Sequence, residues 1–325
     1  MSAPGARAPS FDDVLRASAV VGRRLHRTPT LGSETLGSAF GGRAYLKAEL
    51  FQKTGSFKPR GILAKIATLS AEERTRGVIT ISAGNAAAAV AYGAALAGVD
   101  ALVVMSRGAS TAKVEATRGY GATVDLEAPD PVAAFERVRA LQSETGRAFV
   151  HPFDDPAVIA GHGSLALEIV EDTPEVDVIA VPVGGGGLVS GIALATKGAR
   201  PDVRVVGVEP EGSAALGLAL AAGEPVSIVP ESIADGLNAP HAGAHCLAVA
   251  QAHLDECVSV TEAEIHAGFR FLYERAKLAV EPAGAVAVAA LLAGKVPYVE
   301  GRNVVAVVSG GNVAARTASG ILTPR

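Results

Sequence analysis

The sequence contains no tryptophan, two cysteines and only 4% aromatic residues among its 325 positions. Cys246 and Cys257 lie eleven positions apart with no C-x-x-C spacing, which argues against a disulfide framework or a zinc knuckle and favours a reducing, cytoplasmic compartment. The formal net charge is −4 and there is no basic block, so no nucleic-acid partner is expected. The seven histidines lack metal-ligand spacing, so no metal site is predicted.

No membrane span is predicted either, although residues 178–196 carry no charge. This stretch contains Pro182 and four consecutive glycines, which would break a helix in lipid and leave its backbone groups unsatisfied. A buried strand, a loop and a helix therefore describe it better. Residues 1–10 are rich in Pro, Ala and Gly without an apolar core, so we expect a disordered tail there and no signal peptide.

Apolar runs alternate with helical patterns along most of the chain, which predicts an α/β protein with parallel-type sheets flanked by helices. The first series comprises expected strands at 77–81, 100–105, 122–124 and 148–150, with helices at 85–96, 110–118 and 132–143. A second series begins after His151 with strands at 176–183, 203–208 and 304–308 and helices at 159–170, 188–197, 262–277 and 281–292. We therefore predict a small domain (77–151) inserted into a large one (1–76 and 152–325).

Lys58 stands in the segment Thr54-Gly55-Ser56-Phe57-Lys58-Pro59-Arg60-Gly61, just before a helical run over 62–69. A lysine flanked by glycines and small hydroxyl residues suits a Schiff-base lysine whose backbone passes close to a planar cofactor. By itself this interpretation is weaker than the alternative of a solvated surface lysine.

Gly184, Gly185, Gly186 and Gly187 join an expected strand to a helix that begins near Leu188. Backbone N–H groups at such a junction converge on an anion, and the helix N-terminus adds partial positive charge. The segment therefore predicts a phosphate site, with a plain tight turn as the alternative. A dinucleotide fold is disfavoured, because no start within these glycines satisfies the G-x-G-x-x-G spacing.

Together with Ser82-Ala83-Gly84-Asn85 and Ser309-Gly310-Gly311-Asn312, these segments resemble the fold-type-II pyridoxal-phosphate enzymes. The resemblance is to the threonine and serine dehydratase (ammonia-lyase) and serine racemase branch, from about Phe11 to Asn312. It implies the tryptophan synthase β-like fold, pyridoxal 5′-phosphate as cofactor, a small amino-acid substrate and a homodimer.

The resemblance also implies site roles. Lys58 would carry the cofactor as a Schiff base and serve as the catalytic residue. The remaining cofactor contacts would be Phe57 beside the ring, Asn85 at its phenolic oxygen, Gly184 to Leu188 at the phosphate, Gly236, Glu281, Ser309 at the pyridine nitrogen, and Gly310. The substrate carboxylate would be held by Ser82, Ala83, Gly84, Asn85 and Ala86. The structural alternatives are helix caps at Ser82, Asn85 and Glu281 and a glycine-rich turn with a capping Ser309.

Three departures from the family pattern bear on activity. The family has His and Gln where this chain has Ala86 and Ala88, which leaves its substrate preference open. Serine racemases have a second acid/base serine where this chain has Ala83, so racemisation is disfavoured. The family's divalent-metal loop after Glu209 carries Ala215 in place of a carboxylate, which disfavours metal dependence.

The sequence therefore predicts a threonine ammonia-lyase-like lyase. The expected reaction is β-elimination from L-threonine or a related β-hydroxy amino acid, giving a 2-oxo acid and ammonia. Serine dehydration, racemisation and β-replacement on a serine-type substrate remain alternatives. A non-catalytic cofactor-binding protein is disfavoured by the presence of both Lys58 and Ser309.

Overall fold

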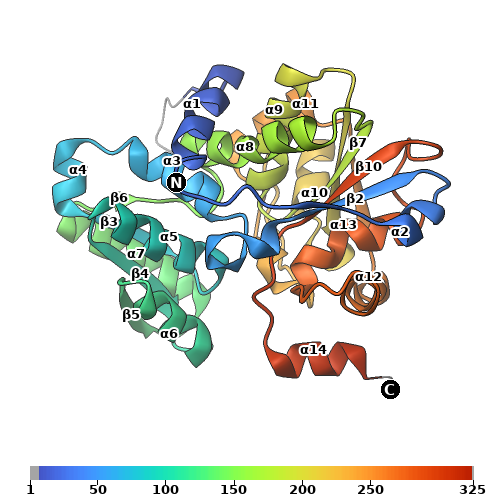
Figure 1. Cartoon of the computed structure of the whole chain (residues 1–325). Helices are drawn as coiled ribbons and strands as arrows, with labels where there is room; N and C mark the ends of the chain where they lie inside the picture. Colours follow the sequence, from blue (N-terminus) through green and yellow to red (C-terminus); the bar gives the residue numbers. More distant parts are fainter. Residues whose placement is uncertain (1–6, 324–325) are drawn as a thin grey trace.

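The computed structural model describes residues 7–323 and contains two separate sheets, each flanked by helices (Figure 1). The larger sheet has the order β1 (Thr30–Gly32), β2 (Arg43–Ala48), β10 (Asn303–Val308), β7 (Val178–Pro182), β8 (Arg204–Pro210), β9 (Glu256–Val260). Only the β1–β2 pair is antiparallel. The smaller sheet is parallel throughout, with the order β5 (Thr123–Ala128), β4 (Ala101–Ser106), β3 (Val78–Ile81), β6 (Ala148–Phe149). The predicted fold class is confirmed.

Helices cover both faces of each sheet, as parallel sheets require. The helices are α1 (Phe11–Val21), α2 (Glu34–Ser38), α3 (Pro59–Ala67), α4 (Ala71–Arg76), α5 (Asn85–Ala97), α6 (Thr111–Gly119), α7 (Pro131–Thr145), α8 (Pro156–Asp172), α9 (Gly187–Ala199), α10 (Ala215–Ala222), α11 (Ala244–His253), α12 (Glu262–Glu274), α13 (Pro282–Leu292) and α14 (Ala315–Leu322). Four 3-10 turns add Glu49–Phe51, Lys53–Gly55, Glu211–Ser213 and Asp235–Leu237.

The strands of the larger sheet are apolar on both faces, and alternate residues feed two different cores. Val178, Ala180 and the even-numbered residues of β10 lie in a cluster with α12 and α13. Ile179, Val181 and the odd-numbered valines of β10 lie in a second cluster with α8 and α9. The long apolar runs in the sequence are therefore explained by burial from both sides.

The smaller sheet uses only strands between Val78 and Phe149, and the larger sheet uses strands before and after that stretch. In Figure 1 the two sheets lie at opposite ends of the molecule, with α3 and α8 between them. Helix α3 packs against both α5 and α8 and so connects the two halves. The division into domains at 76/77 and 151/152 remains a prediction.

Several sequence-based expectations were incomplete. β1, β2, β9 and the helices α1, α2, α4, α10, α11 and α14 were not predicted, because most of these segments are short or have interrupted apolar patterns. The expected disordered tail lies partly in residues 1–6, outside the described residues. The expectation of disorder was wrong for Ser10, which caps α1 and forms a capping box with Asp13. The strand–loop–helix interpretation of residues 178–196 is confirmed by β7 and α9. Within residues 7–323, no helix is long and apolar enough to cross a bilayer.

Candidate active site

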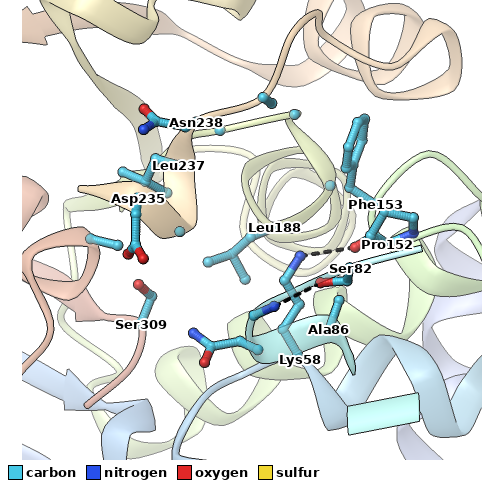
Figure 2. A pocket seen from close by; sticks show the side chains of 18 of the residues that line it. Lys58, Ser82, Ala86, Pro152, Phe153, Leu188, Asp235, Leu237, Asn238 and Ser309 are labelled. Carbon is cyan, nitrogen blue, oxygen red and sulfur yellow. Dashed lines mark hydrogen bonds between the residues drawn. The ribbon is translucent and has the colours of Figure 1, made fainter. Parts of the chain in front are cut away.

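A cavity of about 370 Å³ lies where the carboxyl ends of β3, β7 and β10 face one another (Figure 2). Ligands of open α/β sheets bind outside the carboxyl ends of parallel strands, so this is the expected place for a site. The predicted site residues that line the cavity are Phe57, Lys58, Ser82, Ala83, Gly84, Asn85, Ala86, Gly184, Gly185, Gly186, Gly187, Leu188, Gly236, Glu281 and Ser309. Segments separated by more than 200 positions are thus brought to one cavity.

Gly310 is the one predicted site residue that does not line the cavity. It lies behind Ser309 and pairs with Ser56 in an isolated β-bridge. A Cβ atom at this position would overlap Oε1 of Glu281, so a larger residue would have to displace that carboxylate. Gly310 therefore packs between the lysine loop and Glu281 behind the cavity wall, and its contact with the cofactor remains a prediction.

Lys58 precedes α3 and extends its side chain into the cavity, where Nζ donates a 2.8 Å hydrogen bond to the carbonyl oxygen of Pro152 (Figure 2). Nζ also lies 5.1 Å from the centroid of the Phe57 ring. Burial lowers the pKa of Lys58 to about 8, because the apolar surroundings disfavour the ammonium. A lysine with such a pKa has a reactive neutral amine near neutral pH.

The four glycines turn the chain from β7 into α9, and three of them are required by close packing or by the backbone conformation. A Cβ atom at Gly185 would lie 2.5 Å from the Phe153 ring, and at Gly187 it would lie 2.8 Å from the carbonyl oxygen of Phe153. Gly186 has φ +95° and occupies the N-cap position of α9, where no side chain among the described residues forms a capping hydrogen bond. The N–H groups of the first turn of α9 are therefore available to an anion.

The segment from Ser82 to Ala86 joins β3 to α5 on the side of the cavity formed by the smaller sheet. Oγ of Ser82 accepts a 3.1 Å hydrogen bond from the Gly84 N–H group, while Gly84 occupies the N-cap position of α5 without a side-chain cap. Neither Ser82 nor Asn85 is therefore a simple cap of α5. This arrangement again leaves backbone donors at a helix start facing the cavity.

Asn85 uses its side chain to contact residues from the opposite half of the molecule. Its Nδ2 atom lies 2.7 Å from Oε1 of Glu281, and its Oδ1 atom lies 2.8 Å from Nδ2 of Asn312. Glu281 occupies the N-cap position of α13 without capping it. Burial raises the pKa of the Glu281 carboxyl to about 7, although the hydrogen bond from Asn85 opposes this shift.

Ser309 directly follows β10 and is almost completely buried in the cavity wall, at 3% exposure. Its carbonyl oxygen accepts a 3.1 Å hydrogen bond from the Phe57 N–H group, which ties the lysine loop to the end of β10. Figure 2 shows Ser309 on the side of the cavity opposite Phe153. A neutral hydroxyl is therefore held facing a space bounded by Lys58.

Glu209 does not form part of a metal cluster. Among the described residues, no group of three or more His, Cys, Asp or Glu side chains is placed to share an ion. The Glu209 carboxylate accepts hydrogen bonds from the N–H groups of Leu216 and Gly217 at the start of α10, at 2.7 and 2.8 Å. Burial raises its pKa to about 7.

Several cavity residues were given no role from the sequence. Lys113 of α6 and Asp235 form a 2.8 Å ion pair that joins the two sides of the cavity. Asp235 directly precedes Gly236, which was predicted to contact the cofactor, but Lys113 stands in an ordinary amphipathic helix without a motif. Pro152 and Phe153, in the segment between β6 and α8, also line the cavity.

The residues present fit a pyridoxal phosphate. The cavity offers a primary amine at Lys58, an uncapped helix start with three close-packed glycines for a phosphate, and a buried neutral hydroxyl at Ser309. A dianion at the α9 N-terminus would be stabilised by the helix dipole and by several N–H donors. The donor set is that of an anionic, planar aldehyde cofactor rather than a metal.

Comparisons with known proteins agree with this geometry. Residues 22–310 match the family model described as pyridoxal-phosphate dependent enzyme. The chain is 44% identical over 305 residues to an L-threonine ammonia-lyase of Thermotoga maritima, covering 94% of this chain and 76% of that protein. This match confirms the predicted resemblance to the threonine dehydratase branch.

Solved structures of related enzymes also match the fold of this chain. A threonine deaminase from T.th. matches with a TM-score of 0.87 and 38% identity, covering 94% of this chain and 99% of that one. A maize serine racemase matches with a TM-score of 0.92 and 36% identity, covering 96% of both chains. The chain belongs to the family of pyridoxal-phosphate-dependent enzymes.

Proposed function

We propose that this protein is a pyridoxal-phosphate-dependent threonine ammonia-lyase. It eliminates the β-hydroxyl of L-threonine or a related β-hydroxy amino acid and yields a 2-oxo acid and ammonia. The observation that carries the proposal is the position of Lys58 Nζ in one cavity with the glycine loop, Ser309 and the Asn85 loop. The similarity to threonine ammonia-lyase and threonine deaminase supports the choice of reaction.

The cofactor, when bound, supplies an electron-withdrawing ring that stabilises negative charge at the substrate Cα atom. We place Lys58 as the residue that binds the cofactor and then removes the Cα proton with Nζ. Its lowered pKa of about 8 suits this role, because a general base works best when its pKa lies near the working pH. Ser309 would donate a hydrogen bond without leaving a proton on the ring nitrogen, which favours expulsion of a leaving group over prolonged carbanion chemistry.

The start of α5 is the place we assign to the substrate carboxylate. Ser82, Gly84 and Asn85 line the cavity at a helix N-terminus, where backbone donors and the helix dipole favour a negative charge. Ala86 is buried in the cavity wall directly beside this loop. A side chain no larger than a methyl group leaves room for β-substituents bulkier than that of threonine.

Serine racemisation is the second candidate, because the maize serine racemase has the same fold over 96% of the chain. Racemisation needs a proton donor on the face of Cα opposite the lysine. The cavity residue at the corresponding position of the loop is Ala83, which has no transferable proton. Elimination remains the better-supported reaction.

The proposed function is tested by assaying 2-oxo acid and ammonia release from threonine, serine, 3-hydroxyaspartate and phenylserine. We expect release from at least one of these, with a visible absorbance band of the bound cofactor that changes on substrate addition. Formation of D-serine without 2-oxo acid would support the racemase instead. A protein that binds cofactor but turns over none of the substrates would contradict both.

We also propose that the enzyme is a cytoplasmic homodimer. Both cysteines are free and lie in different elements, α11 and β9, which suits a reducing compartment. The dimer is proposed by analogy with the family alone. Light scattering on the purified holoenzyme would give twice the mass of 32.7 kDa if the proposal is correct.

A further inference from the structure

We propose that Asn312 is a positioning residue that fixes the orientation of the Asn85 amide, so that Asn85 presents an N–H group, and not its oxygen, to the cofactor. The inference rests on the proposed placement of Asn85 beside the cofactor. It concerns a residue in the loop between β10 and α14 to which the resemblance assigns no role.

The argument begins at a backbone carbonyl, whose identity as an acceptor is fixed. Nδ2 of Asn312 donates a 2.7 Å hydrogen bond to the carbonyl oxygen of Thr54, four positions before Lys58. The oxygen and nitrogen ends of an amide are distinguished by such partners. Because a carbonyl accepts only, the end of the Asn312 amide that faces Thr54 must be its NH₂ group.

The same NH₂ group determines the next contact. Its second partner is Oδ1 of Asn85, at 2.8 Å. An NH₂ group donates and does not accept, so the end of Asn85 that faces Asn312 must be the carbonyl oxygen. The NH₂ group of Asn85 is then turned toward Glu281, whose Oε1 atom lies 2.7 Å away.

This sequence of contacts leaves one donor free on Asn85. Its NH₂ group carries two protons, of which Glu281 accepts one. Asn85 lines the cavity, so the second proton is the one available to a ligand there. An anionic oxygen on the cofactor ring would be stabilised by that donor and repelled by the amide oxygen of the opposite orientation.

The backbone around Thr54 is shaped for this contact. Thr54 has φ +63°, a left-handed conformation that is unfavourable for a β-branched residue. The next residue is Gly55, where a Cβ atom would lie 2.5 Å from Oδ1 of Asn312. Unfavourable conformations of this kind persist where the surrounding structure requires them, and they cluster at functional sites. Here they allow the Asn312 side chain to reach the lysine loop.

The hydrogen bonds of Asn85 and Asn312 also connect the two halves of the molecule. Asn85 begins α5 on the smaller sheet, whereas Thr54, Glu281 and Asn312 belong to segments around the larger sheet. Asn312 is exposed and lies outside the hydrophobic cores, so its replacement removes little packing. A change at Asn312 should therefore act on the site and not on the stability of the fold.

The test compares Asn312→Ala and Asn312→Asp holoenzymes with the wild type. Asn312→Ala removes the donor and should release bound cofactor about tenfold faster into a cofactor trap, with a shifted visible absorption maximum. Asn312→Asp offers only acceptors, favours the reversed Asn85 amide and should shift the band further. Arg316→Ala, an exposed change in the same C-terminal segment, is the matched control and should leave both readouts unchanged.

A double-variant cycle distinguishes the proposed action of Asn312 through Asn85 from a general effect of Asn312 on the structure. In an Asn85→Ala background, Asn312→Ala should cause no further change in the band or in cofactor release. A wild-type band and release rate in Asn312→Ala, or an undiminished effect in the Asn85→Ala background, would overturn the inference. If Asn85→Ala itself leaves the band unchanged, the placement of Asn85 and this inference both fail. The proposed reaction is then still judged separately by 2-oxo acid release.

Discussion

The Nζ atom of Lys58 lies 2.8 Å from the carbonyl oxygen of Pro152, a residue 94 positions further along the chain. This contact places the amine against the segment that leads from β6 to α8, with Phe57 on one side and the glycine loop on the other. A backbone carbonyl accepts a hydrogen bond from either the ammonium or the neutral amine. The carbonyl therefore holds Nζ in the cavity without neutralising its charge. Burial of the amine is what lowers its pKa.

The pKa of about 8 for Lys58 predicts how fast the cofactor-free protein captures pyridoxal phosphate at different pH values. Only the neutral amine attacks an aldehyde. Below its pKa the neutral fraction falls about tenfold per pH unit, and above it the fraction is nearly constant. The second-order capture rate, followed by absorbance, should rise from pH 6 to pH 8 and then level off. The control is Nα-acetyl-lysine, whose side-chain amine has an ordinary lysine pKa. Its capture rate should keep rising above pH 8. A protein whose rate still climbs between pH 9 and 10 would contradict the lowered pKa.

Lys58→Ala should abolish 2-oxo acid release and the covalent attachment of the cofactor. The phosphate site at Gly184 to Gly187 is formed by backbone N–H groups and does not include the lysine side chain, so free cofactor should still bind non-covalently. Borohydride treatment followed by mass spectrometry separates the two modes of binding. The wild type should gain the mass of the cofactor and the variant should not. Near-normal ammonia release by the variant would disprove the assignment of Lys58.

Arg60→Met should destabilise the protein strongly. Arg60 is fully buried and pairs with Glu49 at 2.8 Å and Glu168 at 2.7 Å, so its removal takes the guanidinium away from the fully buried Glu49 carboxylate. Breaking a buried ion pair from one side costs ~3–5 kcal/mol. Urea unfolding should show this loss. Arg137→Met, which breaks an ion pair with Asp125 nearer the surface, should cost much less and is the control. Equal losses in the two variants would contradict the buried network.

Ala86→His should narrow the substrate range. Ala86 is buried and lines the cavity, so an imidazole there would fill space that bulky β-substituents need. The ratio of kcat/KM for phenylserine to that for threonine should fall about tenfold or more. Ala88 does not line the cavity, because it lies two positions from Ala86 and therefore about 200° further around α5. Ala88→Gln is therefore the matched control, and an unchanged ratio in Ala86→His would contradict the assignment.

The sequence predicted the ends of β3, β7 and β10 well, because at each of them an apolar strand gives way to glycines or small polar residues. These changes in residue type are local, so the sequence shows them without knowledge of the fold. The larger part of the core was also predictable, since strands buried on both faces are apolar throughout.

Other features depended on contacts between distant segments. β9 carries Glu256 and Cys257 at a sheet edge, where burial on one face leaves too short a pattern to recognise. The ion pair between Lys113 and Asp235 joins residues 122 positions apart, and Lys113 has no distinctive neighbour along the chain. The partners of Asn312 were likewise invisible, because the sequence does not specify which amide faces which carbonyl.

Ser309→Asp tests the electronic role proposed for the residue after β10. The hydroxyl of Ser309 is buried in the cavity wall, and an aspartate there would place a negative charge where the pyridine nitrogen is expected. That charge would stabilise a protonated ring nitrogen, so electron density would move from the substrate Cα atom into the ring. Less density would remain to expel the hydroxyl. The elimination barrier should rise by ~2–4 kcal/mol, comparable to the loss of a preorganised catalytic hydrogen bond. A new long-wavelength absorbance on adding threonine should accompany the fall in 2-oxo acid release.

Ser309→Ala, which removes the hydroxyl without adding charge, should slow the reaction without that band. A Ser309→Asp enzyme with the wild-type rate and no new band would show that Ser309 does not face the ring nitrogen.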